Sequence, residues 1–258
     1  MRALGFRYVV GPPETAAAQA PAENEPYLPG VGPTRTEALA VAQRKQAGYH
    51  LFAAYAPASS SSIPPNDQYV RTLSPAQQVR YSRALFGPES RQKTLHLPFG
   101  ATYTFPTSGC IAKGQAELYG SAEAAQYVVV LPQSLLAQVS SATLLDRAVV
   151  AKSRNWSRCV SKATAESFKT PHDIIERLQR EYATQGPTQA VRNREIAYAV
   201  ADTRCQFRTG LATVYAKVFR READQLAGRT RRLLLQTLEA EQQATARAER
   251  ILSSAGAG

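Results

Sequence analysis

The sequence has few of the residues on which most metal and thiol sites depend. Its 258 residues include only three histidines and three cysteines. These residues are His50, His96, His172, Cys110, Cys159 and Cys205. The histidines form no HExxH pair and the cysteines form no CxxC pair, and both pairs are typical of zinc sites. The sequence therefore predicts no metal ion and no cofactor.

The phosphate-cradling and nucleophile motifs are also absent. There is no G-x-x-x-x-G-K-[ST], no G-x-G-x-x-G and no G-x-S-x-G, so neither nucleotide binding nor a nucleophile elbow is predicted. A cysteine–histidine nucleophile pair stays open, because its members can be distant in sequence. No catalytic constellation is predicted, and the question of enzymatic activity is left open.

Long apolar runs are missing as well. No run of 18 consecutive apolar residues occurs, which predicts that the chain has no transmembrane segment. Met1 to Gly11 lack the apolar core of a signal peptide. With Met1 as the true start, the chain is expected to stay in the cytoplasm.

Acidic residues are outnumbered by basic ones, 20 to 31, which gives a net charge of +11. Such a balance favours acidic partners, namely nucleic acid, anionic lipid or an anionic wall polymer, although a solvated basic surface is the simpler explanation. The basic stretch from Arg220 to Arg232 is interrupted by Glu222 and Asp224, and Phe219 is the only aromatic residue nearby. This pattern favours a solvated helix face over recognition of nucleic acid.

Proline is absent between Thr188 and Ile251. Apolar residues recur there at steps of three, four or seven, which is typical of one face of a helix. We therefore predict one long helix, or two helices end to end or as a hairpin, over residues 188–258. Gly210 and Gly228 are the candidate breaks, because glycine destabilises a helix interior by about 1 kcal/mol relative to alanine.

The rest of the chain indicates an all-α fold with a loosely ordered N-terminal segment. Three regions are predicted: a loose segment over 1–33, with Gly5 to Tyr8 as its apolar anchor, a helical body over 34–187, and the C-terminal helix. Residues 57–67 are expected to form a loop, and residues 94–105 are compatible with a short hairpin. Helices are expected to begin near residues 35, 74, 108, 121, 133, 171 and 188. Thr34, Ser74 and Thr170 are the expected N-terminal caps.

Two aspartate–arginine pairs lie beside apolar stripes. Asp146 precedes Arg147, and Asp202 lies two residues before Arg204, while Trp156 lies on the stripe itself. These residues suggest either a structural polar cluster that ties helices together, which is the simpler reading, or a pocket lining. Trp156 is expected to belong to the core.

Several short motifs together resemble a group of actinobacterial lipoproteins or secreted proteins that have no assigned activity. These motifs are Gly5-Phe6-x-Tyr8, Gly48-Tyr49, Tyr81-x-x-Ala84-Leu85-Phe86-Gly87, Gly109-Cys110, Leu118-Tyr119-Gly120, Trp156-x-x-Cys159 and Ala201-Asp202-x-x-Cys205. The resemblance implies a signal peptide and a further cysteine directly before the residue that is Met1 here. It thus implies that Met1 is internal to a longer reading frame and that a lipid anchor is compatible with the extended form.

A fourth cysteine would make the number even, which suits two disulfides in an oxidising compartment. Cys159 and Cys205 lie on or beside the two strongest apolar stripes, so a bond between their helices is reasonable. Cys110 would then pair with the upstream cysteine. The other pairings stay open, because four cysteines allow three connectivities.

These observations lead to one principal hypothesis and two alternatives. The first is a non-enzymatic cell-envelope or secreted protein that contacts an unknown protein partner, or a second copy of itself, through its C-terminal helix. The second is a cytoplasmic basic helical module that binds nucleic acid or another polyanion. The third is an envelope hydrolase, for which Asp146 and Asp202 would be the residues to test.

Overall fold

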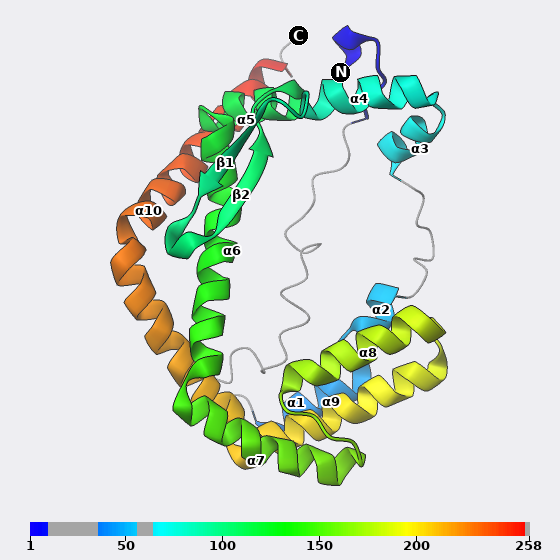
Figure 1. The fold of residues 1–258 in the computed structure, drawn as a ribbon, viewed down its shortest axis with the longest axis vertical. Coiled ribbons are helices and arrows are strands. Elements are labelled where there is room, and N and C mark those ends of the chain that lie inside the picture. Colours follow the sequence, from blue (N-terminus) through cyan, green and yellow to red (C-terminus); the bar gives the residue numbers. More distant parts are fainter. Residues whose placement is uncertain (10–35, 56–63, 256–258) are drawn as a thin grey trace. The chain divides into compact units, whose positions relative to one another are not determined.

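Helices dominate the structure, a computed structural model whose described residues are 1–9, 36–55 and 64–255 (Figure 1). They are α1 (Glu37–Ala47), α2 (Leu51–Tyr55), α3 (Pro65–Arg71), α4 (Pro75–Phe86), α5 (Gly109–Tyr119), α6 (Ala122–Leu145), α7 (Arg147–Thr164), α8 (Pro171–Gln185), α9 (Gln189–Thr209) and α10 (Leu211–Ala255). Strands β1 (Gln92–His96) and β2 (Thr102–Pro106) form an antiparallel hairpin in which Thr94 faces Thr104. The predicted all-α fold is confirmed, and the hairpin forms where it was expected.

The chain divides into two units, each assembled from separate stretches of sequence. Unit 1 comprises Met1–Pro12, Ser62–Val139 and Ala223–Gly258, and unit 2 comprises Pro13–Ser61 and Ser140–Glu222. Helices α6 and α10 contribute residues to both units. This division does not follow the predicted boundary at residue 188, because α9 packs against α1, α7 and α8, which precede it in the sequence.

Side-chain caps fix most of the predicted helix starts. Ser74 and Gln77 form a capping box at the start of α4, and Thr170 and Asp173 form another at the start of α8. Helix α1 begins two residues later than expected and is capped by Thr36, whose hydroxyl accepts a bond from the Leu39 amide at 3.3 Å. The expected cap Thr34 lies outside the described residues.

Two predicted helix boundaries are wrong. Helix α6 continues through Pro132, so no new helix starts at residue 133. Proline removes one N–H donor from the helix, but the neighbouring Val130, Leu131 and Leu135 are all buried, and their packing offsets that loss. The loop predicted over residues 57–67 ends too late, because α3 already starts at Pro65, a residue type that suits the first turn of a helix. Residues 57–63 of this loop are not among the described residues.

The two candidate glycine breaks behave differently. Gly210 ends α9 with a left-handed φ of 67°, and α10 starts at the next residue. Gly228 lies within α10 and does not interrupt it. The C-terminal segment is therefore two helices that meet end to end, and the 45 residues of α10 correspond to about 68 Å of helix at about 1.5 Å per residue.

The first nine residues are attached to unit 1 as the apolar anchor predicted. The rings of Phe6 and Tyr81 meet edge to face with centroids 5.4 Å apart. Val9 exchanges two hydrogen bonds with the Asn66 side chain, each 2.8 Å long. The remainder of the predicted loose segment, residues 10–33, lies outside the described residues.

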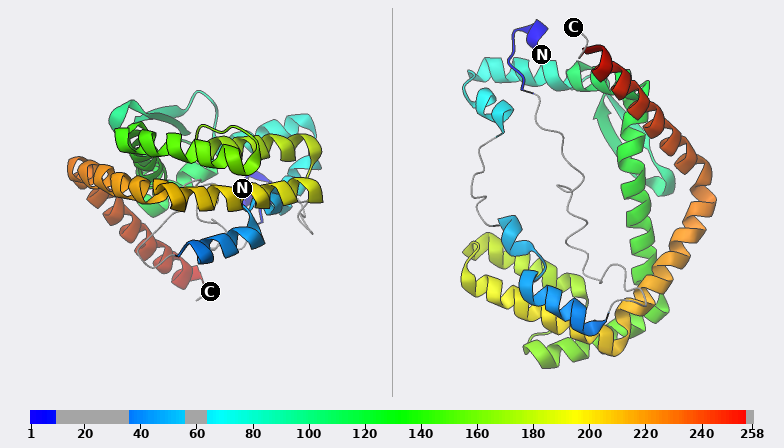
Figure 2. Two further views of the ribbon diagram at one scale, coloured as in Figure 1. Left: turned by 90° about the horizontal axis from the view of Figure 1, so that it is seen from below. Right: turned by 180° about the vertical axis from the view of Figure 1, so that it is seen from behind.

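In unit 1, α6 and α10 lie side by side (Figures 1 and 2). A hollow of about 170 Å³ runs between them and is lined by Tyr127, Val128, Leu233 and Thr237, among others. Helix α6 has the length and mean hydropathy, 1.5, of a membrane-spanning helix, and 22% of its most apolar 18-residue window is buried. The prediction of no transmembrane segment, which considered only uninterrupted apolar runs, stays a prediction.

In unit 2, α7, α8 and α9 pack together and α1 lies against α9 (Figures 1 and 2). Their apolar stripes meet in one core around Trp156, which is fully buried as predicted. Other core residues are Val149, Val160, Ile174, Ile175, Leu178, Tyr182 and Leu211. The same core encloses several buried polar side chains, among them Glu195 and Asp202.

Candidate functional site

Asp202 is the centre of a buried polar cluster in unit 2. Its Oδ1 accepts hydrogen bonds from Trp156 Nε1 at 2.8 Å and from Gln206 Nε2 at 2.9 Å. Its Oδ2 accepts a bond from the Tyr49 hydroxyl at 2.7 Å. The side chain is 1% exposed, and burial raises the pKa of Asp202 to about 6, although these hydrogen bonds act in the opposite direction.

The Asp202 cluster lies one helical turn from a disulfide. Trp156 and Cys159 are three residues apart on α7, and Asp202 and Cys205 are three residues apart on α9, so each pair lies on one face of its helix. The sulfur atoms of Cys159 and Cys205 are 2.03 Å apart, which makes a covalent bond between the two helices. The disulfide and the Trp156–Asp202 hydrogen bond thus fasten the same pair of helices at neighbouring points.

Glu195 is a second buried carboxylate, 1% exposed, and it caps helix α2. It accepts backbone N–H bonds from Tyr49 at 2.7 Å, from Leu51 at 2.9 Å and from Phe52 at 3.0 Å. The Tyr182 hydroxyl donates a fourth bond of 2.5 Å. Unpaired amides at a helix N-terminus carry partial positive charge, so this carboxylate supplies the matching negative charge.

The backbone between α1 and α2 is shaped around the Glu195 carboxylate. Gly48 and His50 have positive φ angles of 59° and 66°. A Cβ atom on Gly48 would lie 2.6 Å from Glu195 Oε1. Only glycine allows the chain to pass this close, and the turn directs the amides on either side of His50 at the carboxylate.

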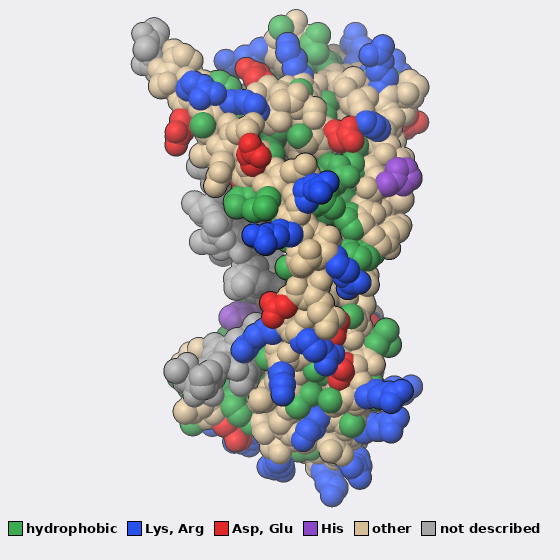
Figure 3. Space-filling view, turned by 90° about the vertical axis from the view of Figure 1, so that its left-hand side faces the viewer, with side chains coloured by type: hydrophobic (Ala, Val, Ile, Leu, Met, Phe, Trp, Pro, Cys, Tyr) green, Lys and Arg blue, Asp and Glu red, His purple; other side chains and the backbone are tan. Residues whose placement is uncertain are grey.

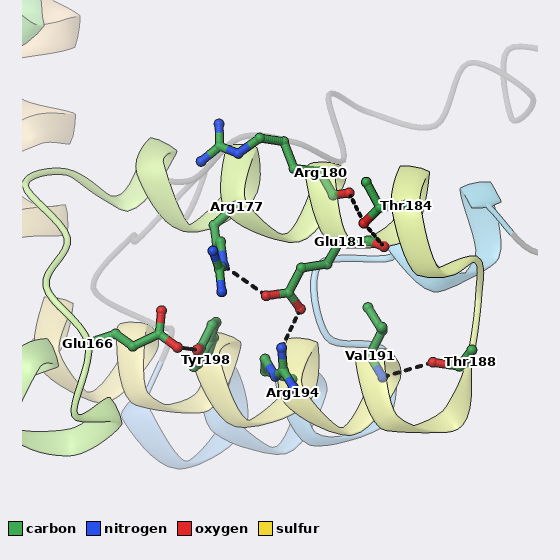
Figure 4. A network of polar contacts seen from close by, with 9 residues as sticks. All are labelled: Glu166, Arg177, Arg180, Glu181, Thr184, Thr188, Val191, Arg194 and Tyr198. Carbon is green, nitrogen blue, oxygen red and sulfur yellow. Dashed lines mark hydrogen bonds and ion pairs between the residues drawn. The ribbon is translucent and has the colours of Figure 1, made fainter.

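A third network joins α8 to α9, as Figure 4 shows. Glu181, 5% exposed, accepts bonds of 2.8 Å from both Arg177 and Arg194. Nearby, the Tyr198 hydroxyl donates a bond of 2.5 Å to Glu166. Burial, followed by this hydrogen bond, raises the pKa of Tyr198 to about 12, so its hydroxyl stays protonated.

The predicted polar residues are only partly brought together. Trp156 and Asp202 form the cluster, whereas Arg204 is exposed. Asp146 caps α7 by accepting bonds from the amides of Ala148 and Val149, and it pairs with Arg221 at 2.9 Å. The hydrogen bond from Arg221 is the main reason that the pKa of Asp146 is lowered. Arg147, next to it, is exposed.

Sequence reasoning missed the partners that complete the buried cluster. These are Tyr49, Tyr182, Glu195 and Gln206. Gln206 follows Asp202 by one helical turn, which could have been read from the spacing. Tyr49 and Glu195 are far apart in the sequence, so no spacing pattern could pair them. The only local indication of this site was the Gly48-Tyr49 motif, which lies in a turn between two helices.

Cys110 is unpaired and half-buried in unit 1. The Met1 amino nitrogen lies 3.4 Å from its sulfur atom. A surface hollow of about 530 Å³ is lined by both residues together with Arg2, Tyr8 and Leu85, among others. Within the described residues, no group of three His, Cys, Asp or Glu side chains is placed to hold a metal ion.

The hydrogen bonds to the Asp202 and Glu195 carboxylates come from N–H and O–H groups of the protein itself. Four donors converge on Glu195 and three on Asp202. Such saturation is typical of carboxylates that hold a fold together. No family model, curated protein or solved structure matches the chain.

Proposed function

We propose that this chain is a non-enzymatic cell-envelope or secreted protein that acts through contacts of its helices. The observation that carries the proposal is that α6 and α10 each expose large apolar side chains in unit 1. Val129, Leu136, Leu235 and Leu238 are each 50–55% exposed. Leu235 and Leu238 are three residues apart on one helix face, and such faces are typical of contact surfaces.

The buried carboxylates support a structural rather than a catalytic role for unit 2. A catalytic acid or base must reach the substrate within hydrogen-bond distance. Asp202 and Glu195 are each 1% exposed and already bonded to several protein groups. A hydrolase that used Asp202 would have to displace those donors.

The Cys159–Cys205 bond supports an oxidising compartment, since structural disulfides persist outside the cytosol. The position of Met1 beside Cys110 supports the proposed upstream cysteine. The Met1 nitrogen, to which such a residue would be bonded, lies 3.4 Å from the Cys110 sulfur. In the extended reading frame, a cysteine at that place would form the second disulfide.

Site-specific photocrosslinking tests the contact surface. A photoreactive amino acid at position 235 is expected to crosslink to a partner protein or to a second copy, whereas the same group at exposed Gln242 is expected to give much less product. Equal yields at both positions would show that this face is not a specific contact.

Thiol alkylation in intact cells, followed by mass mapping, tests the compartment. The Cys159–Cys205 peptide pair should be protected from the alkylating reagent, and protein made from the extended gene should contain a second disulfide that includes Cys110. Recovery of the protein from the cytoplasm with every thiol alkylated would contradict the proposal.

A further inference from the structure

Helix α7 carries five basic residues and no acidic residue over Arg147–Thr164. Arg154, Arg158 and Lys162 are exposed and four residues apart, so they form one row along the helix. This row lies on the side of α7 opposite the buried residues Val149 and Trp156. The row is therefore turned away from the core of unit 2.

Arginines of α9 extend this row across the neighbouring helix. Arg204 and Arg208 are exposed and also four residues apart. The Arg208 guanidinium lies 3.9 Å from the Cys159 sulfur, which places it at the junction with α7. Together, Arg154, Arg158, Lys162, Arg204 and Arg208 are called the basic face of unit 2.

Among the described residues, no carboxylate pairs with the basic face. The two carboxylates of α9, Glu195 and Asp202, are both buried and point into the core. Lys and Arg side chains also outnumber acidic ones on the lower part of the view in Figure 3. The charge of the face is thus left available to an external anion.

Two exposed apolar side chains lie at the N-terminal end of α7. Leu144 and Leu145 end α6 directly before Asp146, the cap of α7, and they are 42% and 80% exposed. Large apolar side chains next to a row of basic ones are typical of proteins that lie on anionic membranes, where the apolar groups enter the headgroup region. The phosphate backbone of nucleic acid offers no comparable place for leucine.

We propose that the basic face of unit 2 binds the surface of an anionic phospholipid bilayer and that Leu144 and Leu145 insert at its edge. The exposed residues among the basic ones on α7, such as Ala151 and Asn155, are small or polar, so the row can approach the headgroups closely. The only aromatic side chain of α7, Trp156, is buried, so the helix offers no exposed ring for the stacking that single-stranded nucleic acid requires. This inference does not depend on the compartment or on the contact surface proposed above.

Co-sedimentation of the full chain with vesicles tests the proposal. Vesicles of equimolar phosphatidylcholine and phosphatidylglycerol are expected to bind the chain, vesicles of phosphatidylcholine alone are not, and added salt should weaken the binding. Each basic residue near such a surface changes partitioning about fivefold. The variant R154Q/R158Q/K162Q should therefore bind about 100-fold more weakly than the wild type.

The matched control is R231Q/R232Q/R250Q, which removes the same charge from exposed positions of α10. It should change binding much less than the α7 variant. The variant L144S/L145S should lower binding to anionic vesicles about tenfold, because less apolar surface is buried. Circular dichroism of each variant should match the wild type, since all of these side chains are exposed.

A second measurement uses the wild-type chain and needs no variant. A dicarbonyl reagent modifies accessible arginines, and anionic vesicles should protect Arg154, Arg158, Arg204 and Arg208 but not Arg231. No binding to anionic vesicles, equal losses in both triple variants, or no effect of the leucine substitutions would overturn the proposal. Binding of duplex DNA that requires the α7 row, without vesicle binding, would assign the face to nucleic acid instead.

Discussion

The Asp202 carboxylate keeps its proton to a higher pH than an exposed aspartate does, because burial disfavours the charged form more than its three hydrogen bonds favour it. Its pKa is about 6 in the folded chain, against an ordinary value of 3.8. Between these two values the folded state holds a proton that the unfolded state has released. Stability contributed by Asp202 therefore decreases as the pH rises through this window.

The substitution Asp202→Asn should remove this pH dependence. The stability of the wild type relative to D202N is expected to fall by about 2 kcal/mol between about pH 4 and about pH 7, because one pKa unit corresponds to about 1.4 kcal/mol and part of the change lies outside this range. Denaturant unfolding at several pH values measures this difference. The control E176Q, which alters an exposed carboxylate of α8, should show no such trend, and a D202N curve parallel to the wild type would refute the assignment.

A single methyl group at Gly48 should disturb the Glu195 site. The substitution Gly48→Ala is expected to cost about 2–4 kcal/mol, since it combines a left-handed backbone with displacement of the Glu195 carboxylate from its amides. The control is G186A in the same unit, where φ is 71° but nothing lies within 4 Å of the added atom. It should cost less than G48A, about 1–3 kcal/mol in thermal or denaturant unfolding, because only the backbone conformation opposes it. Similar losses for both variants would mean that the carboxylate moves aside freely.

At the scale of single elements, the two glycines of the C-terminal segment have opposite roles. Gly210 terminates α9 in a left-handed conformation, whereas Gly228 lies in the interior of α10 with open space around it. The substitution G210A should destabilise the chain by about 1–2 kcal/mol, and G228A should stabilise α10 by up to about 1 kcal/mol. Unfolding curves followed by circular dichroism give both values. A destabilising G228A would argue against a continuous α10.

At the scale of the whole molecule, the disulfide and the only tryptophan both lie in unit 2. Loss of the Cys159–Cys205 bond in the variant C159S/C205S should lower the stability of that unit by about 2–4 kcal/mol. Tryptophan fluorescence should report this shift. Far-UV circular dichroism should show two unfolding transitions. The transition of unit 2 should shift in the variant, and the transition of unit 1 should stay unchanged. A single transition that shifts equally in both signals would show that the chain unfolds as one cooperative structure.

The local features of this protein were determined by its sequence. Ser74 with Gln77 and Thr170 with Asp173 specified helix starts, because a capping box satisfies backbone amides within one turn. The absence of proline after Thr188 specified the long helices, and the spacing of Trp156 with Cys159 and Asp202 with Cys205 placed each pair on one helix face. The four-residue spacing of Arg154, Arg158 and Lys162 likewise places these residues on one side of α7.

Only the tertiary structure decided which distant groups meet. Tyr49 reaches both carboxylates of α9, its hydroxyl bonding to Asp202 and its amide to Glu195, although about 150 residues lie between these partners. No periodicity links residues so far apart, because their contact depends on how α1, α2 and α9 pack. Tertiary packing also decided where helices continue, as Pro132 and Gly228 show. Each weakens a helix locally, and each nevertheless lies inside a continuous one, because local propensity is smaller than the energy of packing along the rest of the helix.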